Sequence, residues 1–460
     1  MKKKALVFID TDVAIRHFIK NTTFSKLSEA YEIIYVFNND KTTDKSSVNT
    51  PLDSLGLKNI RYTTVPRRRT GKWYFLFAAT VLRQQRGLPN YTARKRQLVQ
   101  SLGSRNVFLL LILGLPVIYP IFKFIFEQLM GIDSSVRGII EDERPDIVIH
   151  PSVLNGYYIN ELLLMKRKSG LPLCLLMNSW DNPSAKAVAT GIPDFMAVWG
   201  EQSKQQALDY MKIPSKNLEI FGAAQFQIYR SAPEESIKEL YDFFEVPYGK
   251  KIILYAGSGN GDYETKYLKL LDRAVTEKIL PNCHVLYRPH PWRGGLGDGE
   301  DDFFSIKWEN ITMDPTMRNY YVHEVQHNTG HVFMADYEIS NKLLTVTDAV
   351  ISPLSTILIE SLLKGKPALA FFPEIHHEVH FGIDEVHFSD FLKIPEVKVC
   401  LKEENFLGAC RELYDQTNDS SLPEILKKRA HFYVDMNKPS YGERLRCKID
   451  QLTDGKEQVR

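Results

Sequence analysis

Short apolar runs recur along this chain, and each is followed by a polar turn and by residues with helical spacing. The first two runs, residues 5–9 and 33–37, flank a segment at 18–30 whose apolar residues recur every three or four positions. A continuous apolar run of this length is typical of a parallel strand buried on both faces, and the spacing between the runs is typical of a helix. The sequence therefore predicts that the chain opens with a βαβ unit.

The same alternation returns twice more, which predicts two α/β domains. Further strands are expected at residues 146–150, 173–177, 195–199 and 218–221. A polar helical bridge follows at residues 232–244. Beyond it, strands are expected at residues 251–256, 284–287 and 348–351. A chain of 460 residues also exceeds what one hydrophobic core usually holds. We expect a Rossmann-like domain over residues 1–230, a second over 245–430, and a C-terminal helix over 431–460.

One region, residues 66–131, breaks the alternation and reads as an insertion in the first domain. Residues 66–105 contain ten basic side chains, several aromatic ones and no Asp or Glu, and residues 107–126 are almost wholly apolar apart from two prolines and Lys123. A basic, aromatic segment beside an apolar one suits an anionic membrane surface, although a buried helical hairpin with a solvated basic face would show the same pattern. The expected membrane contacts are Arg67, Arg68, Arg69, Lys72 and Trp73.

Overall composition narrows the classes of partner. The net charge of +2 indicates no particular partner, and nucleic acid ranks below a membrane because an apolar segment has no use on a phosphate backbone. The five cysteines lack CxxC spacing, which favours a reduced chain without a structural metal. The N-terminal apolar run is too short for a signal peptide. We expect a cytoplasmic protein that lies peripherally on the inner face of the membrane.

Polar side chains follow the first strands at the sheet edge where open α/β sheets bind ligands. Asp10, Asp12 and His17 come directly after the first strand, and Asp181 follows a later strand beside Trp180, whose ring could stack on a sugar. Each of these four is a candidate general base. Each also has a structural interpretation, as a helix cap, a turn residue or a solvated loop side chain.

Three polar loops follow strands of the second domain and point to phosphate binding. Gly257, Ser258 and Gly259 would allow close approach of a diphosphate, and Arg288 and His290 offer two cationic or hydrogen-bonding groups after a strand. The third loop carries hydroxyl groups before a short helix, where free backbone N–H groups favour anions. Its candidate residues are Ser352, Ser355 and Thr356, followed one turn later by Glu360.

These motifs resemble those of GT-B glycosyltransferases, in particular bacterial surface-polysaccharide transferases that share features with sialyltransferases, Kdo transferases and CDP-glycerol transferases. His290-Pro291 matches the His-Pro motif of the CMP-sugar enzymes, and Ser355-Thr356 matches their paired hydroxyl motif. Residues 179–182, 198–201 and 221–226 also look like elements of polysaccharide-biosynthesis transferases. The resemblance covers roughly residues 140–450 and excludes the insertion.

The resemblance implies a function. It implies two Rossmann-like domains facing across a cleft, with a nucleotide-sugar donor, CMP-linked or else UDP- or GDP-linked, held by its phosphates on the second domain. Glu360 would bind the donor ribose. The acceptor would be a lipid-linked sugar or a growing polysaccharide, in capsule or lipopolysaccharide synthesis. No convincing DxD pair follows a strand, so we expect no metal and no cofactor.

Three other functions fit parts of the same pattern. A nucleotide-sugar epimerase would share the architecture but would have no use for the insertion at residues 66–126. A phosphotransferase of the CDP-glycerol type would use the same phosphate ligands. A non-catalytic membrane scaffold would have no reason to keep polar ligands at three separate loops.

Overall fold

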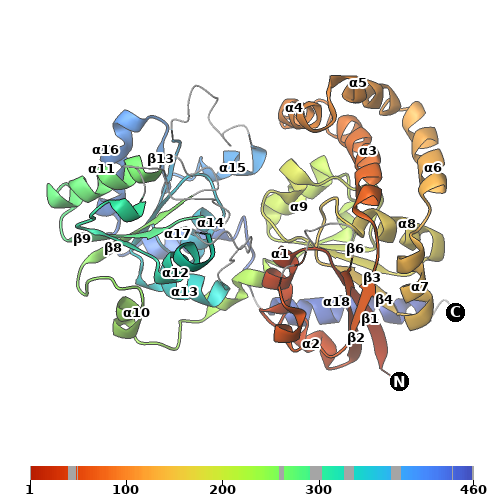
Figure 1. Ribbon diagram of the computed structural model, residues 1–460, viewed down its shortest axis with the longest axis horizontal. Helices are drawn as coiled ribbons and strands as arrows, with labels where there is room; N and C mark the ends of the chain where they lie inside the picture. The colour runs from red at the N-terminus through yellow and green to blue at the C-terminus, as the bar shows by residue number, and fades with distance from the viewer. Residues whose placement is uncertain are drawn as a thin grey trace. The chain divides into compact units, whose positions relative to one another are not determined.

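The computed structural model describes residues 2–39, 48, 50–257, 264–290, 303–325, 336–373, 385–437 and 439–457 (Figure 1). The chain divides into two compact units. Unit 1 comprises Met1–Gln227, Glu385–His387 and Tyr433–Arg460, and unit 2 comprises Ile228–Asp384 and Phe388–Phe432.

Among the described residues, unit 1 is built on a sheet of seven parallel strands in the order β3-β2-β1-β4-β5-β6-β7. The central strands β1, β4, β5 and β6 are almost wholly buried, because helices cover both faces of the sheet. The strands are β1 Lys3–Ile9, β2 Tyr31–Asn38, β3 Ile60–Thr63, β4 Ile147–His150, β5 Leu173–Leu176, β6 Phe195–Val198 and β7 Leu218–Ile220. The helices are α1 Asp12–Ala14, α2 Ser25–Ser28, α3 Arg67–Gln84, α4 Tyr91–Leu102, α5 Ser104–Leu113, α6 Ile118–Met130, α7 Ser134–Glu143, α8 Ile159–Ser169, α9 Glu201–Tyr210 and α18 Tyr441–Glu457.

Strand order in this sheet reverses between β1 and β4. From β1 the chain runs outward through β2 to β3, and after the helices α3 to α7 it returns to β4, which lies on the other side of β1. Such a reversal, a topological switch point, leaves the two following loops diverging, so that a crevice opens at the carboxyl ends of the two strands.

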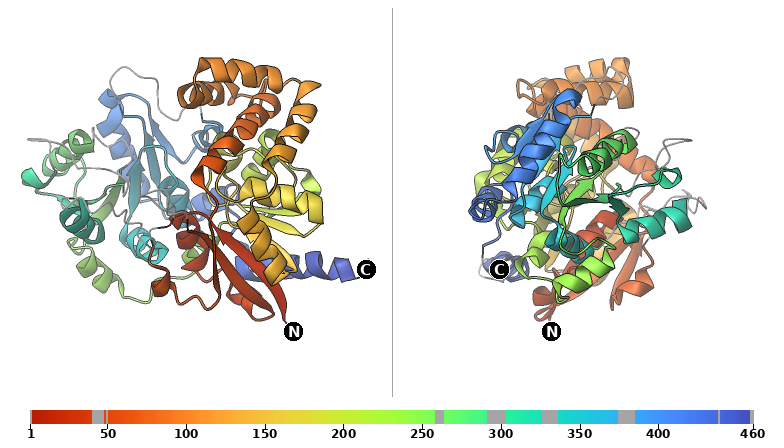
Figure 2. Two further views of the ribbon diagram at one scale, coloured as in Figure 1. Left: turned by 45° about the vertical axis from the view of Figure 1, so that its right-hand side comes forward. Right: turned by 90° about the vertical axis from the view of Figure 1, so that its left-hand side faces the viewer.

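The segment that interrupts the alternation folds as four helices, α3 to α6, which stand together on unit 1 (Figure 2). Their shared core includes Trp73, Leu76 and Phe77 of α3, with Leu110 of α5 and Tyr119 of α6. In the described part of the chain, no single helix is long and apolar enough to span a bilayer. The pair α5 and α6 meets that test only together, across a bend of 106°.

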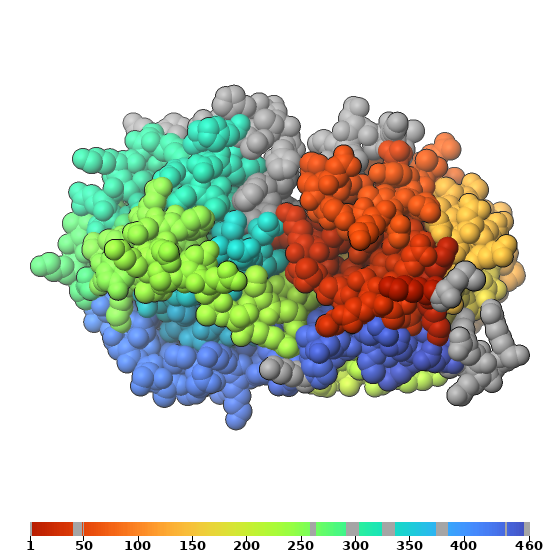
Figure 3. Space-filling view, turned by 90° about the horizontal axis from the view of Figure 1, so that it is seen from below, coloured from red at the N-terminus to blue at the C-terminus, as the bar shows by residue number. Residues whose placement is uncertain are grey.

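The C-terminal helix α18 belongs to the core of unit 1. Tyr441, Leu445 and Ile449 of α18 lie in the same hydrophobic cluster as the first strands. The hydroxyl of Tyr31 on β2 donates to the Asp450 carboxylate at 2.8 Å. Figure 3 shows α18, in blue, against the red N-terminal segment. The two ends of the chain therefore stabilise one core, and unit 1 is not contiguous in sequence.

Unit 2 has its own sheet, with six parallel strands among the described residues, in the order β10-β9-β8-β11-β12-β13. Strand order reverses between β8 and β11, so this sheet also has a topological switch point. The strands are β8 Lys251–Ala256, β9 Cys283–Arg288, β10 Ile311–Met313, β11 Ala349–Ser352, β12 Ala368–Phe371 and β13 Lys398–Cys400. The helices are α10 Ile237–Phe243, α11 Glu264–Thr276, α12 Pro315–Tyr320, α13 Tyr337–Val346, α14 Ile357–Leu363, α16 Phe406–Gln416 and α17 Leu422–Ala430. The boundary between the units falls within α15 Val386–Phe391.

These two sheets confirm the predicted α/β fold class, and the central strands lie where the apolar runs predicted them. One prediction was wrong: residues 18–30 do not form a continuous helix. A single π-helical turn, Ile15–Ile19, and the short α2 are separated at Thr22, whose φ of 59° is left-handed. The side chain of Asn21 accepts from the Thr23 amide at 3.2 Å, and such local bonds compete with helical ones.

Candidate functional site

Three strands of unit 2 end side by side at the carboxyl edge of its sheet. Ala256 at the end of β8 pairs with Arg288 on β9, and Tyr255 pairs with Ile351 on β11, so that Ser352 ends the neighbouring strand. The Gly257 amide also donates to the Arg288 carbonyl at 2.9 Å. The loops that carry Gly257, Arg288 and Ser352 therefore follow three adjacent strands, and the first and last of them flank the switch point.

The guanidinium of Arg288 is held in a fixed place at this edge. Its Nη1 donates to the Ser340 hydroxyl at 3.3 Å, and its Nε lies 3.6 Å from the carboxylate of Asp314, which is fully buried at the end of β10. Asp314 in turn caps α12 by accepting from the Thr316 amide at 2.9 Å. Asp314 thus positions Arg288, a relation that the sequence did not reveal because β10 was not predicted.

Hydroxyl groups gather in the turn after β11. The hydroxyls of Ser352 and Ser355 lie 3.0 Å apart, and Ser352 is fully buried whereas Ser355 and Thr356 are partly exposed. Thr356 occupies the N-cap position of α14, yet its side chain makes no capping bond. The amides of Leu358 and Ile359 in the first turn already donate to the carbonyl groups of Ser355 and Thr356. The groups of this turn that can donate to an anion are therefore the side-chain hydroxyls.

Backbone and carboxylate approach closely after β8. A Cβ atom placed on Gly257 would lie 2.7 Å from the Glu264 carboxyl carbon. Glu264 begins α11, is fully buried, and accepts a hydrogen bond from the Tyr287 hydroxyl. Gly257 is therefore required by packing. The predicted ligands Ser258 and Gly259 lie outside the described residues.

Two further predicted donor-site residues are partly or fully enclosed. His290 follows β9 and is half-buried, and its carbonyl accepts from the buried Tyr321 hydroxyl at 2.8 Å. Glu360 of α14 is 7% exposed and accepts a hydrogen bond from the Tyr229 hydroxyl. Tyr229 was missed by the sequence analysis, and the Glu360 carboxylate is bound within the protein rather than freely presented.

In unit 1, the switch point is occupied by a buried carboxyl group and a buried imidazole. Asp10 follows β1 and is 2% exposed, and His150 ends β4 and is fully buried. The Asp10 Oδ2 atom lies 3.7 Å from His150 Nε2. Among the described residues, neither ring nitrogen of His150 nor the Asp10 Oδ1 atom has a hydrogen-bond partner. A Cβ atom on Gly156 would lie 3.4 Å from the Asp10 Cγ atom, so the backbone of the loop after β4 approaches the carboxyl group closely at this glycine.

Burial sets the protonation of this Asp10–His150 pair. Burial raises the pKa of Asp10 to about 7, although hydrogen bonds from the Asp10 backbone and from Thr11 act to lower it. Burial also lowers the pKa of His150 to about 3. At neutral pH the imidazole is therefore neutral, and the carboxyl group exchanges its proton readily. A buried acid poised near neutrality is suited to proton transfer. Sequence analysis missed His150, because only the order of the strands places it beside Asp10.

The other two candidates after β1 have structural partners. The Asp12 carboxylate accepts from the Thr50 amide at 2.9 Å and from the Thr50 hydroxyl at 2.6 Å, and Thr11 rather than Asp12 caps α1. His17 is 7% exposed, and burial lowers its pKa to about 3, aided by the charge of Arg16 and opposed by a bond to the Asn178 backbone. His17 is thus neutral at physiological pH.

Asp181 lies in a compact polar cluster. Its Oδ2 atom is 2.6 Å from the Lys186 ammonium. Burial opposes ionisation, but the charge and hydrogen bond of Lys186 outweigh it, and the pKa of Asp181 is lowered. Trp180, the expected sugar platform, is 2% exposed and donates to the Gln202 side chain at 2.7 Å. A buried indole cannot stack on a sugar, so that expectation was wrong.

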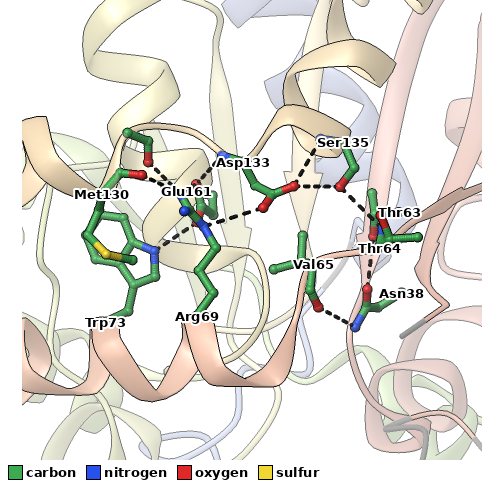
Figure 4. A network of polar contacts seen from close by, with 11 residues as sticks. Asn38, Thr63, Thr64, Val65, Arg69, Trp73, Met130, Asp133, Ser135 and Glu161 are labelled. Atoms are coloured by element: carbon green, nitrogen blue, oxygen red, sulfur yellow. Dashed lines mark hydrogen bonds and ion pairs between the residues drawn. The ribbon is translucent and has the colours of Figure 1, made fainter. Parts of the chain in front are cut away.

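Two of the five expected membrane contacts point into the protein instead. Arg69 and Trp73 of α3 converge on Glu161 of α8, a fully buried carboxylate (Figure 4). The Trp73 indole donates to Glu161 at 2.9 Å, and Arg69 also donates to the backbone carbonyls of residues 130 and 131. A buried carboxylate needs such partners. Arg67, Arg68 and Lys72, in the same first turns of α3, are exposed.

The described residues contain no group of three or more His, Cys, Asp or Glu side chains that could hold a metal ion. The polar groups that the structure places at the two switch points include the Arg288 guanidinium and the hydroxyls of Ser355 and Thr356 in unit 2, and the Asp10 carboxyl group and the His150 imidazole in unit 1. Such a set can bind an anion in unit 2 and move a proton in unit 1.

Comparison with known proteins identifies the fold. No protein-family model and no curated protein sequence matches the chain. Among solved structures, the S. aureus MnaA co-structure with UDP is similar over 99% of this chain and 97% of that chain, with a TM-score of 0.52 and 13% identity. The UDP-GlcNAc 2-epimerase from Neisseria meningitidis bound to UDP-GlcNAc is similar over 97% and 99%, with a TM-score of 0.52 and 12% identity.

A third similar structure is the putative UDP-N-acetylglucosamine 2-epimerase from Listeria monocytogenes, which covers 98% of this chain and 96% of that chain, with a TM-score of 0.51 and 12% identity. At these identities the likeness concerns the fold alone. The chain has the two-sheet α/β fold that these proteins share, a GT-B-like fold.

Proposed function

We propose that this protein is a glycosyltransferase that moves a sugar from a nucleotide-sugar to a lipid-linked or polysaccharide acceptor without a metal ion. The observation that carries the proposal is the arrangement of Gly257, Arg288 and Ser352 on three adjacent strand ends at the switch point of unit 2. In open α/β sheets this is the position where ligands bind.

The donor's phosphates would occupy this edge. Arg288 supplies a fixed positive charge, and the hydroxyls of Ser355 and Thr356 supply neutral donors. Together they neutralise the charge that develops on the leaving phosphate, a role that a metal fills elsewhere. CMP-linked donors are favoured by the His-Pro and Ser-Thr motifs, with UDP- and GDP-linked donors as further candidates.

Transfer also needs a base for the acceptor hydroxyl. As the acceptor oxygen bonds to the anomeric carbon, the bond from that carbon to the phosphate oxygen breaks, and the nucleotide leaves with the electron pair. Asp10 would accept the hydroxyl proton, because burial places its pKa near 7. Its carboxyl group is 2% exposed, so the acceptor would first have to displace the atoms that cover it. The neutral imidazole of His150, 3.7 Å away, forms part of the buried surroundings of this carboxyl group.

A second candidate, a nucleotide-sugar epimerase, is favoured by the same Asp10–His150 pair. A buried base with a pKa of about 7 is also suited to removing a proton from carbon. Two of the similar structures named above, from S. aureus and Neisseria meningitidis, contain UDP or UDP-GlcNAc, so UDP-GlcNAc belongs among the compounds to test.

One assay separates the two functions. The protein is incubated with CMP-, UDP-, GDP- and CDP-linked sugars in deuterated water, with and without a bacterial lipid extract, and products are followed by phosphorus and proton NMR. A transferase releases free nucleotide only when the extract is present. An epimerase yields an isomeric sugar, labelled with deuterium and still attached to its nucleotide. Recovery of every donor unchanged would contradict both.

A further inference from the structure

The outer face of helices α5 and α6 exposes an unusual density of large apolar side chains. Val117, Ile121 and Phe124 are 79%, 60% and 60% exposed, and Leu129 is 83% exposed. Val117, just before α6, and Ile121 and Phe124 recur at helical spacing, and Leu129 lies near the end of the helix. Phe108, Leu109 and Ile112 continue the exposed face on α5. We call these seven residues the α5–α6 face. A contiguous apolar surface of this kind marks an interaction site.

This face also contains a groove of about 380 Å³ with no charged residue in its lining. The groove is lined by Leu113, Val117, Ile118, Ile121, Phe122, Ile125, Phe126 and Leu129. The opposite sides of the helices carry the packing, since Leu110 and Tyr119 lie in the buried cluster shared with α3. The fold therefore keeps α5 and α6 in place without using their outer face.

The charge around the face is of one sign. No Asp or Glu occurs between residues 54 and 126. Arg105 is exposed one turn before Phe108 on α5, and Arg83 reaches the break between the helices, where it donates to the Pro116 carbonyl at 3.3 Å. Glu127, the first acid after the stretch, is 5% exposed and pairs with Arg167 at 2.6 Å. Cations therefore border the apolar face.

We propose that the α5–α6 face binds the surface of an anionic lipid bilayer, with its apolar side chains in the headgroup and acyl boundary and the bordering cations on lipid phosphates. Helices of ten and thirteen residues rise about 15 Å and 20 Å, short of the roughly 30 Å hydrocarbon core. Their 106° bend also prevents them from forming one continuous span. The helices therefore lie in the interface.

Flotation of the full-length protein with vesicles tests the proposal. Two kinds of vesicle are compared, phosphatidylcholine alone and phosphatidylcholine mixed with phosphatidylglycerol. The wild type should float with the anionic vesicles and less with the neutral ones, and added salt should reduce flotation. The triple variant Val117→Ser, Ile121→Ser, Phe124→Ser should lower partitioning at least about tenfold, because it removes three exposed apolar side chains.

Matched controls separate this effect from a general loss of surface apolarity. Phe243→Ser and Tyr248→Ser in unit 2 remove exposed aromatic side chains, 44% and 71% exposed, and should float like the wild type. The triple variant should unfold at the wild-type temperature, since the three side chains are exposed. Wild-type flotation by the triple variant, or no flotation by the wild type, would overturn the proposal.

The competing occupant is a second copy of the chain, and sedimentation velocity reports on it. A wild-type dimer that the triple substitution dissociates, together with no vesicle binding, would assign the face to self-association and overturn the lipid proposal. Flotation needs no nucleotide, so its failure is independent of failure of the proposed transferase activity.

Discussion

The two sheets have the same kind of switch point, yet the residues at each differ in chemistry. In unit 2 the edge carries Arg288 and the partly exposed hydroxyls of Ser355 and Thr356. In unit 1 the equivalent edge carries Asp10 and His150, which are both buried. One architecture thus provides a charged, hydrogen-bonding edge in one unit and a dry, titratable edge in the other.

The difference shows how burial selects function. In unit 2 a partly buried guanidinium and partly exposed hydroxyls can donate to an anion, whereas in unit 1 burial raises the pKa of Asp10 to about 7 and suits it to accept a proton. Both edges also have a glycine against a carboxyl group, Gly156 against Asp10 and Gly257 against Glu264. Each sheet therefore places a carboxyl group where the chain leaves a switch strand.

The largest expected effect is on turnover. Asp10→Asn removes the proton acceptor but keeps the shape of the side chain, so we expect kcat to fall by roughly 10²- to 10⁴-fold with little change in donor affinity. The measurement is steady-state kinetics on the donor that the NMR assay selects. The matched control is Asp12→Asn, at a carboxylate that accepts from the amide and the hydroxyl of Thr50, and this variant should retain most activity. Equal losses of kcat in the two variants would show that Asp10 has no catalytic role that Asp12 lacks.

The pH dependence of stability is the next largest effect. The pKa of Asp10 is raised from 3.8 to about 7 by burial, so the folded protein binds more protons than the unfolded chain between these values. Its contribution to stability therefore falls as pH rises from 4 to 7, by at most about 4 kcal/mol.

Urea unfolding of the wild type and Asp10→Asn across pH 4 to 8 measures this contribution. The variant should gain stability relative to the wild type as pH rises. The buried His17 and His150 have lowered pKa values, so their contributions to stability increase as pH rises, opposite to the contribution of Asp10. Both histidines are present in both proteins, so the difference in unfolding free energy between the two proteins isolates the contribution of Asp10. A difference that does not vary with pH would show that Asp10 titrates normally.

Nucleotide affinity should depend on Arg288. Losing a charge-assisted bond to phosphate costs roughly 1.5–3 kcal/mol, so Arg288→Ala should weaken nucleotide binding about 10- to 100-fold in calorimetry. The matched control is Arg318→Ala, which removes an exposed pair with Glu245 in the same unit and should leave binding unchanged. Comparable weakening in both variants would indicate a general electrostatic effect rather than a specific ligand.

The smallest effect concerns the two glycines. Gly156→Ala and Gly257→Ala would each press a methyl group against a carboxyl group, and each should destabilise the protein by about 1–3 kcal/mol. Gly71→Ala and Gly138→Ala, in α3 and α7, meet no atom within 4 Å and should be neutral or stabilising. Thermal unfolding of the four variants separates the two classes. If all four behave alike, the close approach has no energetic consequence.

Sequence alone predicted the parts of the molecule that local chemistry determines. The central strands were predicted because each is a continuous apolar run. The short edge strands β3, β10 and β13 were not predicted, because polar and apolar residues are mixed in them. Ser352 and Arg288 were predicted at strand ends, because a strand and its following loop are local.

What the sequence could not show is which strands are neighbours. His150 becomes a partner of Asp10 only because β4 lies next to β1, across a separation of 140 residues. Arg69 and Trp73 were assigned to a membrane surface because the stretch is basic and aromatic. Their actual partner, Glu161, is remote in the sequence and buried.

The most direct test of the account is calorimetry of CMP, CDP, UDP and GDP with the wild type, Asp10→Asn, and the double variant Ser355→Ala, Thr356→Ala. We predict that the wild type and Asp10→Asn bind one of these nucleotides with similar affinity, and that the double variant binds it at least about tenfold more weakly. Nucleotide binding that depends on Asp10 but not on the hydroxyls, or no binding by the wild type, would contradict the division of roles between the two switch points.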